Sequence, residues 1–428
     1  MRVLQCLSRA SGEDALYLTL EEERMLRGDF GEVVAEAMRI LVSLGEAYGA
    51  EKMVEISSAH LVQGYVSRIG DAGIAFFENL AKRRANVKVF TTLNTMAYDR
   101  KNWKAMGIIN EDYCLTESRI LRALEKIGCQ SLCTCTPFYY SFPRFGEHIS
   151  WAESNAVIFA NSVLGARCSR EGGPTACMAA LTGRTPLYSF HLRKNRLGKI
   201  WVNVDVELEG TCDFGVLGYC VGKMAANRVP VLEGISEKVR VEDLVELGSA
   251  LATSGAIGMY HVVGVTPEAR SKGEAFGDTK PEEKIVIGRT ELKEVYEELT
   301  TKRGRIDWVV LGCPHYTLRQ IAEVTKLLGG RKIHDGVRLW IHTSEGVYAL
   351  AERLGYADSI RKAGGLLTVD ICMVGQNPLI LKTFGRLVIA TDSAKQAFYI
   401  GPARGWHDTI LGSTKDCLEA AIAGRFEG

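Results

Sequence analysis

The chain lacks the features that define several common classes of protein. No apolar run approaches the roughly 20 residues of a membrane span, and the first 14 residues contain no apolar core of signal-peptide length. The 52 lysines and arginines nearly balance the 51 aspartates and glutamates, which leaves a net charge of +1. The composition therefore predicts a cytoplasmic protein that binds neither nucleic acid nor a membrane surface.

Paired motifs are missing as well. The 12 cysteines show no regular spacing and no C-x-x-C pair, which argues against a disulfide framework and against a structural zinc site. The glycines of segment 215–226 do not form G-x-G-x-x-G, so they indicate close helix packing rather than a dinucleotide site. Glutamine is scarce, with six in 428 residues, and with abundant Glu, Lys and Arg this favours a thermophilic source.

The chain does contain alternating strands and helices, without internal repeats or low-complexity segments. At 428 residues it is long enough for two or three domains, and we divide it at 1–130, 131–280 and 281–428. Strands are predicted at 53–56, 87–90, 200–208, 257–263, 284–287, 307–311, 339–342, 366–369 and 387–390. Helices are predicted after a capping box at Thr19 and Glu22, and at 33–44, 72–82, 241–252, 291–300, 318–328, 345–354 and 415–423. This alternation predicts a layered α/β fold with mostly parallel sheets.

Segment 133–173 is the most unusual stretch. It combines thiols, carboxylates, amides, hydroxyls and arginines around a short apolar segment, which indicates an active site. Glu153 is the candidate acid or orienting carboxylate, although a carboxylate at a helix start is also favoured by the helix dipole. Asn155 and Asn161 are candidates for holding a hydroxyl or a metal-bound water, and Ser154 is a candidate for binding the substrate.

Other polar residues are placed where ligands are commonly bound. His60, Thr92 and Asn94 lie at predicted strand ends, where open α/β sheets bind ligands, and caps or turns are the alternative. Arg170 can bind a carboxylate or phosphate, with Glu171 as its alternative partner, and Gly172 lets backbone N–H groups approach an anion. Lys395 could bind an anionic substrate group or be a solvated helix lysine, and His315 is a candidate neighbour of a ligand.

Three cysteines are candidates for an iron–sulfur cluster. Cys135, Cys313 and Cys372 each lie where a strand is expected to give way to a loop. Three thiolates on a four-iron cluster leave one iron open to act as a Lewis acid. The alternative is ordinary packing, because cysteine is among the most buried residue types. Cys133, two residues before Cys135, competes with it as the ligand.

Several motifs together resemble one known family. They are C-T-P-F-Y from Cys135, W-A-E-S-N-A, A-N-S-V-L-G-A-R, R-E-G-G, T-T-L-N, G-V-T-P-E-A, L-G-C-P-H and S-A-K-Q-A-F-Y, in a consistent order across nearly the whole chain. The set resembles the catalytic large subunit of the aconitase X family, iron–sulfur hydro-lyases related to aconitase. The resemblance implies that Cys135, Cys313 and Cys372 hold the cluster, of the [4Fe-4S] type with one open iron, and that the A-E-S-N-A and A-N-S residues line the site.

The resemblance also implies a reaction and a partner. The catalytic base in this superfamily is a serine on a swivel domain, for which the chain has no room, so a separate small subunit is expected to supply it. The family dehydrates small anionic hydroxy acids, either mevalonate 5-phosphate or cis-3-hydroxy-L-proline, and the thermophile-like composition favours the first. An iron–sulfur sensor or scaffold without catalysis is the alternative of another class.

Overall fold

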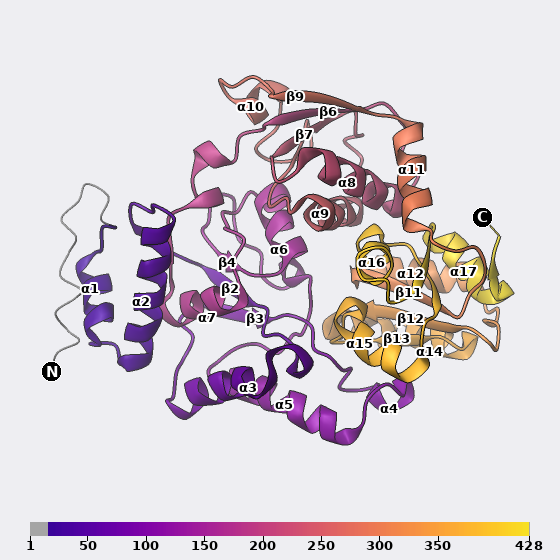
Figure 1. Ribbon diagram of the computed structural model, residues 1–428, viewed down its shortest axis with the longest axis horizontal. Coiled ribbons are helices and arrows are strands. Elements are labelled where there is room, and N and C mark those ends of the chain that lie inside the picture. Colours follow the sequence, from indigo (N-terminus) through magenta and orange to yellow (C-terminus); the bar gives the residue numbers. More distant parts are fainter. Residues whose placement is uncertain (1–15, 428) are drawn as a thin grey trace.

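Parallel sheets dominate the structure. The computed structural model describes residues 16–427 and contains three parallel sheets, with strand orders β3-β2-β4, β8-β7-β6-β9 and β13-β12-β11-β14-β15. Two short antiparallel pairs, β1-β5 and β10-β16, complete the strands of this part of the chain. Figure 1 shows the first sheet near the centre, the second at the top and the third on the right, each covered by helices. The predicted layered α/β fold with mostly parallel sheets is confirmed.

The three-stranded sheet is surrounded by the N-terminal helices. Its strands are β2 (Ser58–Leu61), β3 (Phe90–Leu93) and β4 (Ser150–Trp151), and the nearby antiparallel pair is β1 (Met53–Glu55) and β5 (Arg184–Pro186). The helices are α1 (Leu20–Arg27), α2 (Glu32–Ala47), α3 (Val66–Lys82), α4 (Trp103–Met106), α5 (Glu111–Lys126), α6 (Ser154–Phe159) and α7 (Gly173–Thr182), with the 3-10 turn η1 (Pro137–Tyr139) and the π-helical turn η2 (Ala160–Leu164). The predicted capping box of α1 is confirmed, because Thr19 and Glu22 each accept the other's backbone N–H.

Two strands of this sheet differ from the prediction. The strand predicted at 53–56 is present as β1, but His60 after it lies inside a further strand, β2, that was not predicted, and Thr92 lies inside β3, which begins where the predicted strand 87–90 ends. The cause is polar pairing within the sheet: His60 Nδ1 and Thr92 Oγ1 are 2.8 Å apart on neighbouring strands, and both side chains are buried. This contact satisfies polar groups that sequence patterns assign to loops.

The four-stranded sheet contains β6 (Ile200–Val204), β7 (Pro230–Glu233), β8 (His261–Val262) and β9 (Glu283–Ile287). It is accompanied by α8 (Thr211–Ala225), α9 (Val241–Gly255), α10 (Lys272–Phe276), α11 (Arg289–Leu299) and the 3-10 turns η3 (Ser189–His191) and η4 (Arg193–Asn195). The glycines of α8 do permit close packing, since a Cβ on Gly218 would collide with the Leu247 carbonyl of α9. Strand β8 is shorter than predicted because Tyr260 N–H donates to Ser162 Oγ and the Gly258 carbonyl accepts from Asn161, outside the sheet.

The five-stranded sheet forms the C-terminal part. Its strands are β11 (Trp308–Tyr316), β12 (Arg338–Thr343), β13 (Leu366–Thr368), β14 (Val388–Thr391) and β15 (Asp408–Leu411), and the small pair is β10 (Gly304–Arg305) and β16 (Arg425–Phe426). The helices are α12 (Leu318–Leu328), α13 (Glu345–Arg353), α14 (Tyr356–Ala363), α15 (Met373–Phe384), α16 (Ala394–Ile400) and α17 (Thr414–Ala423). Strand β11 is longer than predicted and contains Cys313, with a shift of register between Leu311 and Tyr316.

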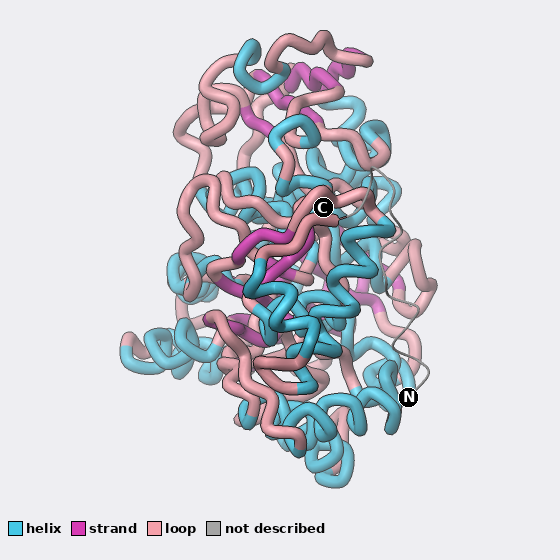
Figure 2. The backbone as a smooth tube through the Cα atoms, turned by 90° about the vertical axis from the view of Figure 1, so that its left-hand side faces the viewer, coloured by secondary structure: helices cyan, strands magenta, loops and turns pink. Residues whose placement is uncertain are grey.

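Helices and loops cover the strands in a perpendicular view as well (Figure 2). The apolar core is divided among clusters that follow the three parallel sheets, and the largest buried side chains include Trp151 and Trp308. Between residues 16 and 427, no helix is both long and apolar enough to cross a membrane.

Candidate active site

Two sheets present their carboxyl ends to a common region. In the five-stranded sheet the strand order reverses between β11 and β14, and in the three-stranded sheet it reverses at β2. Crevices outside the carboxyl ends of strands at such reversals are the usual ligand sites of open α/β sheets. Cys313 lies in the C-terminal half of β11 and Lys395 lies in α16, which follows β14, while the segment after β4 carries Glu153 and Asn155. Hydrogen bonds join these two groups, so the reversals of both sheets meet at one site.

The sheets are joined beside Cys372. Met96, just past β3, forms a parallel bridge with Ile371, and its N–H donates to the Asp370 carbonyl at 2.6 Å. Arg100 binds both carboxylate oxygens of Asp370, at 2.8 and 2.9 Å. A bidentate guanidinium–carboxylate pair fixes orientation as well as distance. This pair therefore positions the loop that carries Cys372 against the three-stranded sheet.

The three predicted ligand cysteines come together in the fold. Cys135 and Cys313 are buried and Cys372 is partly exposed. Burial raises the pKa of the Cys313 thiol, and the charges of Cys372 and Cys135 raise it further while Lys395 lowers it. Burial likewise raises the pKa of Cys135, and the negative charge of Glu153 raises it further. The backbone N–H of His315, whose nitrogen lies 3.4 Å from Cys135 Sγ, lowers it. Three thiols from distant segments thus share one electrostatic environment.

Cys133 faces a different environment from Cys135. After burial, the groups that shift the pKa of Cys133 are Asp370 and Arg100, whereas those around Cys135 include Glu153, Cys372 and Lys395. Cys133 has a positive φ of 45°, a left-handed conformation that is uncommon outside glycine. The two thiols therefore lie in different surroundings, and only Cys135 is close to Cys372 and Lys395. This favours Cys135 as the ligand.

The donor set fits an iron–sulfur cluster better than a single metal ion. Among residues 16–427, no group of three His, Cys, Asp or Glu side chains is placed to hold one ion. In a cluster each cysteine binds a different iron, so its ligands surround it rather than converge on one atom. Thiolates are the soft ligands that such clusters use. Burial raises the pKa of Cys313 and Cys372, and the charge of Lys395 partly opposes this effect.

Gly312 shapes the segment that carries Cys313. Its φ is 89°, and a Cβ at this position would collide with the backbone carbonyl of His342 on β12. Only glycine combines this conformation with this close approach. Beyond Cys313, His315 Nε2 lies 2.8 Å from the Ile371 carbonyl and its Nδ1 lies 3.0 Å from Thr134 Oγ1. His315 therefore links the segments of all three cysteines.

Lys395 is a buried cation beside the thiols. Its ammonium donates to Glu153 Oε1 at 3.1 Å, Asn155 Oδ1 at 3.2 Å and Ser154 Oγ at 3.3 Å. Burial lowers its pKa, but Glu153, Cys313 and Cys135 more than offset this and hold the pKa above its ordinary value. Lys395 therefore remains charged, and the alternative of a solvated surface lysine does not apply, since the residue is only 8% exposed.

The partners of Lys395 are fixed by a helix start. Glu153 is the N-cap of α6, where its Oε2 accepts the N–H groups of Asn155 at 2.7 Å and Ala156 at 3.1 Å. Asn155 Nδ2 also donates to the Cys135 carbonyl at 2.7 Å. The cap predicted as the alternative role for Glu153 is thus present together with the contact to Lys395. One carboxylate organises the helix and the cation at once.

Polar atoms without partners gather at the carboxyl ends of the two sheets. His60 Nε2 and Asn94 Oδ1 are buried and have no hydrogen-bond partner, and the same holds for the side-chain oxygens of Gln63, Gln376 and Gln396 and for both amide atoms of Asn377. Burial lowers the pKa of His60 to about 3, so its ring is neutral. Unpaired buried polar groups are costly, which favours a bound group or water in this region.

The remaining predicted residues are not joined to the Lys395 group by hydrogen bonds. Asn161 binds the backbone of Cys168 on both sides and accepts from Arg196. Glu171 is buried and accepts from Thr175 and Thr185 rather than from Arg170. Arg170 is exposed and donates to the Ala256 carbonyl, and Gly172 is the N-cap of α7.

Sequence reasoning missed two buried acids. Glu246 of α9 is 4% exposed and Asp392, after β14, is 7% exposed. Burial raises the pKa of both; the charge of Asp392 raises that of Glu246 further, and Lys395 lowers it. Asp392 precedes the S-A-K-Q-A-F-Y motif by one residue, which was a usable signal. Glu246 lies inside an otherwise ordinary amphipathic helix and gave none.

Comparisons with known proteins identify the family of the chain. The first, second and third domains of aconitase X match residues 15–194, 198–297 and 306–423. The phosphomevalonate dehydratase large subunit of Methanocaldococcus jannaschii is 41% identical over 411 residues, which cover 94% of this chain and all of that protein. The cis-3-hydroxy-L-proline dehydratase of Pseudomonas aeruginosa is 35% identical, over 94% of this chain and 70% of its own length.

A solved structure supports the same relationship. The holo-form of aconitase X from Thermococcus kodakaraensis superposes with a TM-score of 0.86 at 37% identity, over 95% of this chain and all of that one. The curated relatives are dehydratases, which confirms the predicted hydro-lyase class. The match of all three domains and the full-length identity show that the chain belongs to the aconitase X family.

Proposed function

We propose that the chain is the large subunit of an iron–sulfur hydro-lyase that dehydrates (R)-mevalonate 5-phosphate to trans-anhydromevalonate 5-phosphate. The observation that carries the proposal is the convergence of Cys135, Cys313 and Cys372 with the charged Lys395 at the strand ends of two sheets. The 41% identity to a phosphomevalonate dehydratase large subunit over that protein's full length supports the choice of substrate.

Cys135, Cys313 and Cys372 would hold the cluster, of the [4Fe-4S] type with one iron free of protein ligands. When bound, such a cluster supplies a Lewis acid that polarises the substrate hydroxyl. The chain's own contribution is positional. Arg100 and Asp370 fix the loop of Cys372, and His315 ties the segments of all three cysteines together.

Lys395 would bind an anionic group of the substrate. Its three present partners lie at 3.1 to 3.3 Å, and an ammonium group can rotate its donors from one partner to another without changing its charge. Glu153 then remains held by two backbone N–H groups of α6 and can orient the hydroxyl, or can accept a proton from the Lys395 ammonium and pass it to the departing hydroxyl. Asn155, Ser154, His60, Thr92 and Asn94 would complete the contacts with the substrate.

We assign Asn161, Glu171 and Gly172 to structural roles, since their polar groups already bind neighbouring parts of the chain. Arg170 lies on the surface.

The base would come from a separate small subunit that carries a serine. Two observations support a partner. The similar archaeal proteins are named large subunits, and the hydroxyproline dehydratases extend beyond the region that this chain matches, which is 70% of their length. In this proposal the partner closes over the site and removes the proton from the carbon next to the hydroxyl.

The proposal is tested by turnover in the assembled enzyme. The chain would be purified anaerobically with the small subunit encoded by the same organism, and mevalonate 5-phosphate and cis-3-hydroxy-L-proline would be compared as substrates. We expect dehydration of the first, at least 100-fold faster than of the second, and little turnover without the small subunit. Faster turnover of cis-3-hydroxy-L-proline would make this compound the substrate instead. A chain that holds its cluster but turns over neither compound would favour the sensor alternative.

A further inference from the structure

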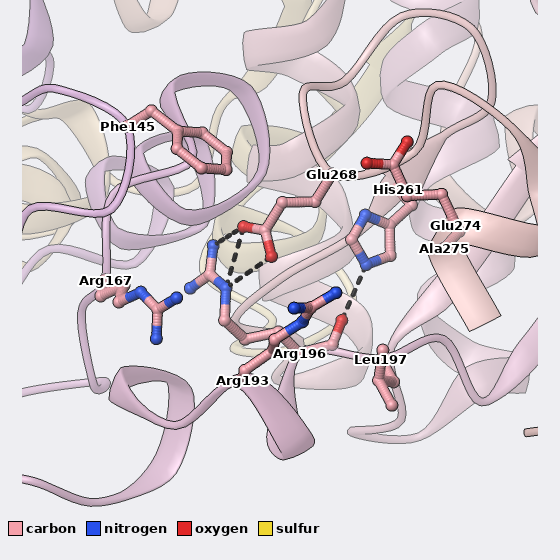
Figure 3. A pocket seen from close by; sticks show the side chains of 9 residues that line it. All are labelled: Phe145, Arg167, Arg193, Arg196, Leu197, His261, Glu268, Glu274 and Ala275. Atoms are coloured by element: carbon pink, nitrogen blue, oxygen red, sulfur yellow. Dashed lines mark hydrogen bonds and ion pairs between the residues drawn. The ribbon is translucent and has the colours of Figure 1, made fainter. Parts of the chain in front are cut away.

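A polar cavity lies outside the candidate active site. It has a volume of about 190 Å³ and shares no lining residue with that site. Figure 3 shows Arg167, Arg193 and Arg196 on one side, His261 and Glu268 on the other, and the ring of Phe145 above. The arginines come from segment 167–196, and His261 and Glu268 come from the region of β8. Nothing in the proposed dehydration uses these residues.

One of the three arginines is fully engaged. Every N–H of Arg196 has an acceptor: Glu268, the side chain and carbonyl of Asn161, and the Phe190 carbonyl. Arg196 is 1% exposed. Its charge and that of Glu268 therefore cancel, and this pair forms a wall of the cavity rather than a free binding group.

The other two arginines have no carboxylate partner in residues 16–427. Arg167 donates one N–H to the His191 carbonyl and forms no ion pair. The exposed side chain of Arg193 forms neither a hydrogen bond nor an ion pair within the described residues. Burial and then the charge of Arg196 lower the pKa of Arg167, while the charge of Glu268 raises it. Glu274, at the edge of the cavity, carries the one remaining negative charge among the lining residues. The cavity thus has a net positive charge.

His261 adds a hydrogen-bond acceptor. Its ring is 1% exposed, and Nε2 lies 2.7 Å from the Arg196 carbonyl. A carbonyl can only accept, so Nε2 carries the hydrogen, and in the neutral ring Nδ1 is left with a lone pair. Nδ1 is buried and has no partner, and in Figure 3 this edge of the ring is turned toward the side on which Glu268 lies.

We propose that this cavity binds a small oxyanion that carries one hydroxyl hydrogen, such as hydrogen phosphate or the phosphate or hydroxycarboxylate end of a metabolite. The guanidinium groups of Arg167 and Arg193 bind the anionic oxygens, and the O–H donates to His261 Nδ1. The volume equals the share of about six water molecules, which leaves room for more than the anionic group alone. The ligand would also tie segment 167–196 to the region of β8.

Phosphate and sulfate provide a matched pair of probes. At pH 7 both are tetrahedral anions, but only phosphate retains a hydroxyl hydrogen. Titration calorimetry on the full chain with its cluster should show phosphate binding at least 10-fold tighter than sulfate, because sulfate leaves Nδ1 without a donor. Glycolate compared with acetate repeats the test for a carboxylate, and whichever hydroxylated probe binds tighter identifies the natural head group.

Two neighbouring charges supply the control. Arg193→Gln should weaken phosphate binding about 5- to 10-fold, whereas Lys194→Gln, an equal charge change at the next exposed position outside the lining, should leave it unchanged. Lys395→Gln should also leave it unchanged. Equal binding of phosphate and sulfate, or no binding of either at tens of millimolar, would overturn the proposal. So would phosphate binding that survives Arg193→Gln but is lost in Lys395→Gln, since the anion would then occupy the candidate active site.

Discussion

Two buried cations in this protein are each paired with a carboxylate and an asparagine, and they differ in how their donors are used. Lys395 contacts Glu153 and Asn155, and Arg196 contacts Glu268 and Asn161. The two asparagines are six residues apart in one helical segment. The planar guanidinium of Arg196 has all its donors fixed by acceptors in the fold. The ammonium of Lys395 is held by longer contacts and can exchange them.

The comparison separates a structural ion pair from one suited to binding. Around Arg196 the polar groups of Asn161 are satisfied on every side. Around the strand ends near Lys395, several buried polar atoms have no partner. A fold that leaves such groups unpaired loses stability unless something else fills the space. Unpaired polar atoms, rather than burial or charge alone, mark the regions suited to binding, and His261 Nδ1 is the corresponding atom of the cavity beside Arg196.

The largest effect is expected at Lys395. Lys395→Met removes the cation but leaves Glu153 bound by two N–H groups of α6. We expect kcat/KM of the two-subunit enzyme to fall about 100- to 1000-fold, the usual loss for one electrostatic contact at the reacting group. Steady-state kinetics with mevalonate 5-phosphate measure this loss. Lys194→Met is the control, and a loss below fivefold in Lys395→Met would contradict a role of Lys395 in substrate binding.

Arg196 should instead affect stability. Arg196→Met leaves Glu268 and the Asn161 carbonyl without their donor, and breaking a buried pair costs about 3–5 kcal/mol. Because 19% of the Glu268 side chain remains exposed, we expect a decrease of about 3 kcal/mol in the free energy of unfolding. Denaturant unfolding provides the measurement. An unchanged midpoint, or a loss of activity per folded molecule as large as that of Lys395→Met, would contradict a purely structural role.

The two asparagines provide a further test, because replacing Asn161 should mainly lower stability and replacing Asn155 should mainly lower activity. Asn161→Ala should lower the free energy of unfolding by about 2 kcal/mol, since it leaves buried backbone groups of Cys168 and Gly258 unpaired. Asn155→Ala should lower it by about 1 kcal/mol and reduce kcat/KM at least 10-fold. Both variants would be followed by unfolding and by kinetics. Equal changes in stability and in kcat/KM for the two variants would contradict the distinction between a structural and a functional region.

The smallest effect concerns pH near Arg196. Burial, then Arg167 and Arg196, lower the pKa of His148 to about 4, against about 6.5 in an unfolded chain. Between these values the unfolded state binds a proton that the folded state does not, so stability falls as pH decreases from 6.5 to 4. His148→Gln should make this fall shallower, by less than about 1.4 kcal/mol per pH unit because the half-buried ring is partly screened. An unchanged slope would show that His148 titrates normally.

Local patterns predicted the framework of the fold. The capping box at Thr19, the helices α2, α12 and α17, and the parallel strands of the C-terminal sheet lie close to their predicted positions. These elements follow from apolar periodicity and helix caps, which depend only on neighbours in the sequence. The division into parts at 130 and 280 stays a prediction.

The site depended on contacts between distant residues, which patterns do not encode. His60 and Thr92 were assigned to strand ends because polar residues are unusual inside a buried strand, but they satisfy each other there. The choice between Cys133 and Cys135 depends on a left-handed backbone turn that the sequence did not indicate. Glu246 reaches the region from a helix of another sheet. The ligand roles of the cysteines came from a resemblance to a family and stay a proposal.

The central claim is that Cys135, Cys313 and Cys372 hold an iron–sulfur cluster. It is tested most directly by anaerobic iron and sulfide analysis with electron paramagnetic resonance on the wild type and on single Cys→Ala variants. The matched control is Cys133→Ala, because Cys133 is also buried and lies two residues from Cys135. We predict a cluster in the wild type and in Cys133→Ala, and loss of the cluster in each of the three ligand variants. A cluster that survives Cys135→Ala but is lost in Cys133→Ala would contradict the assignment.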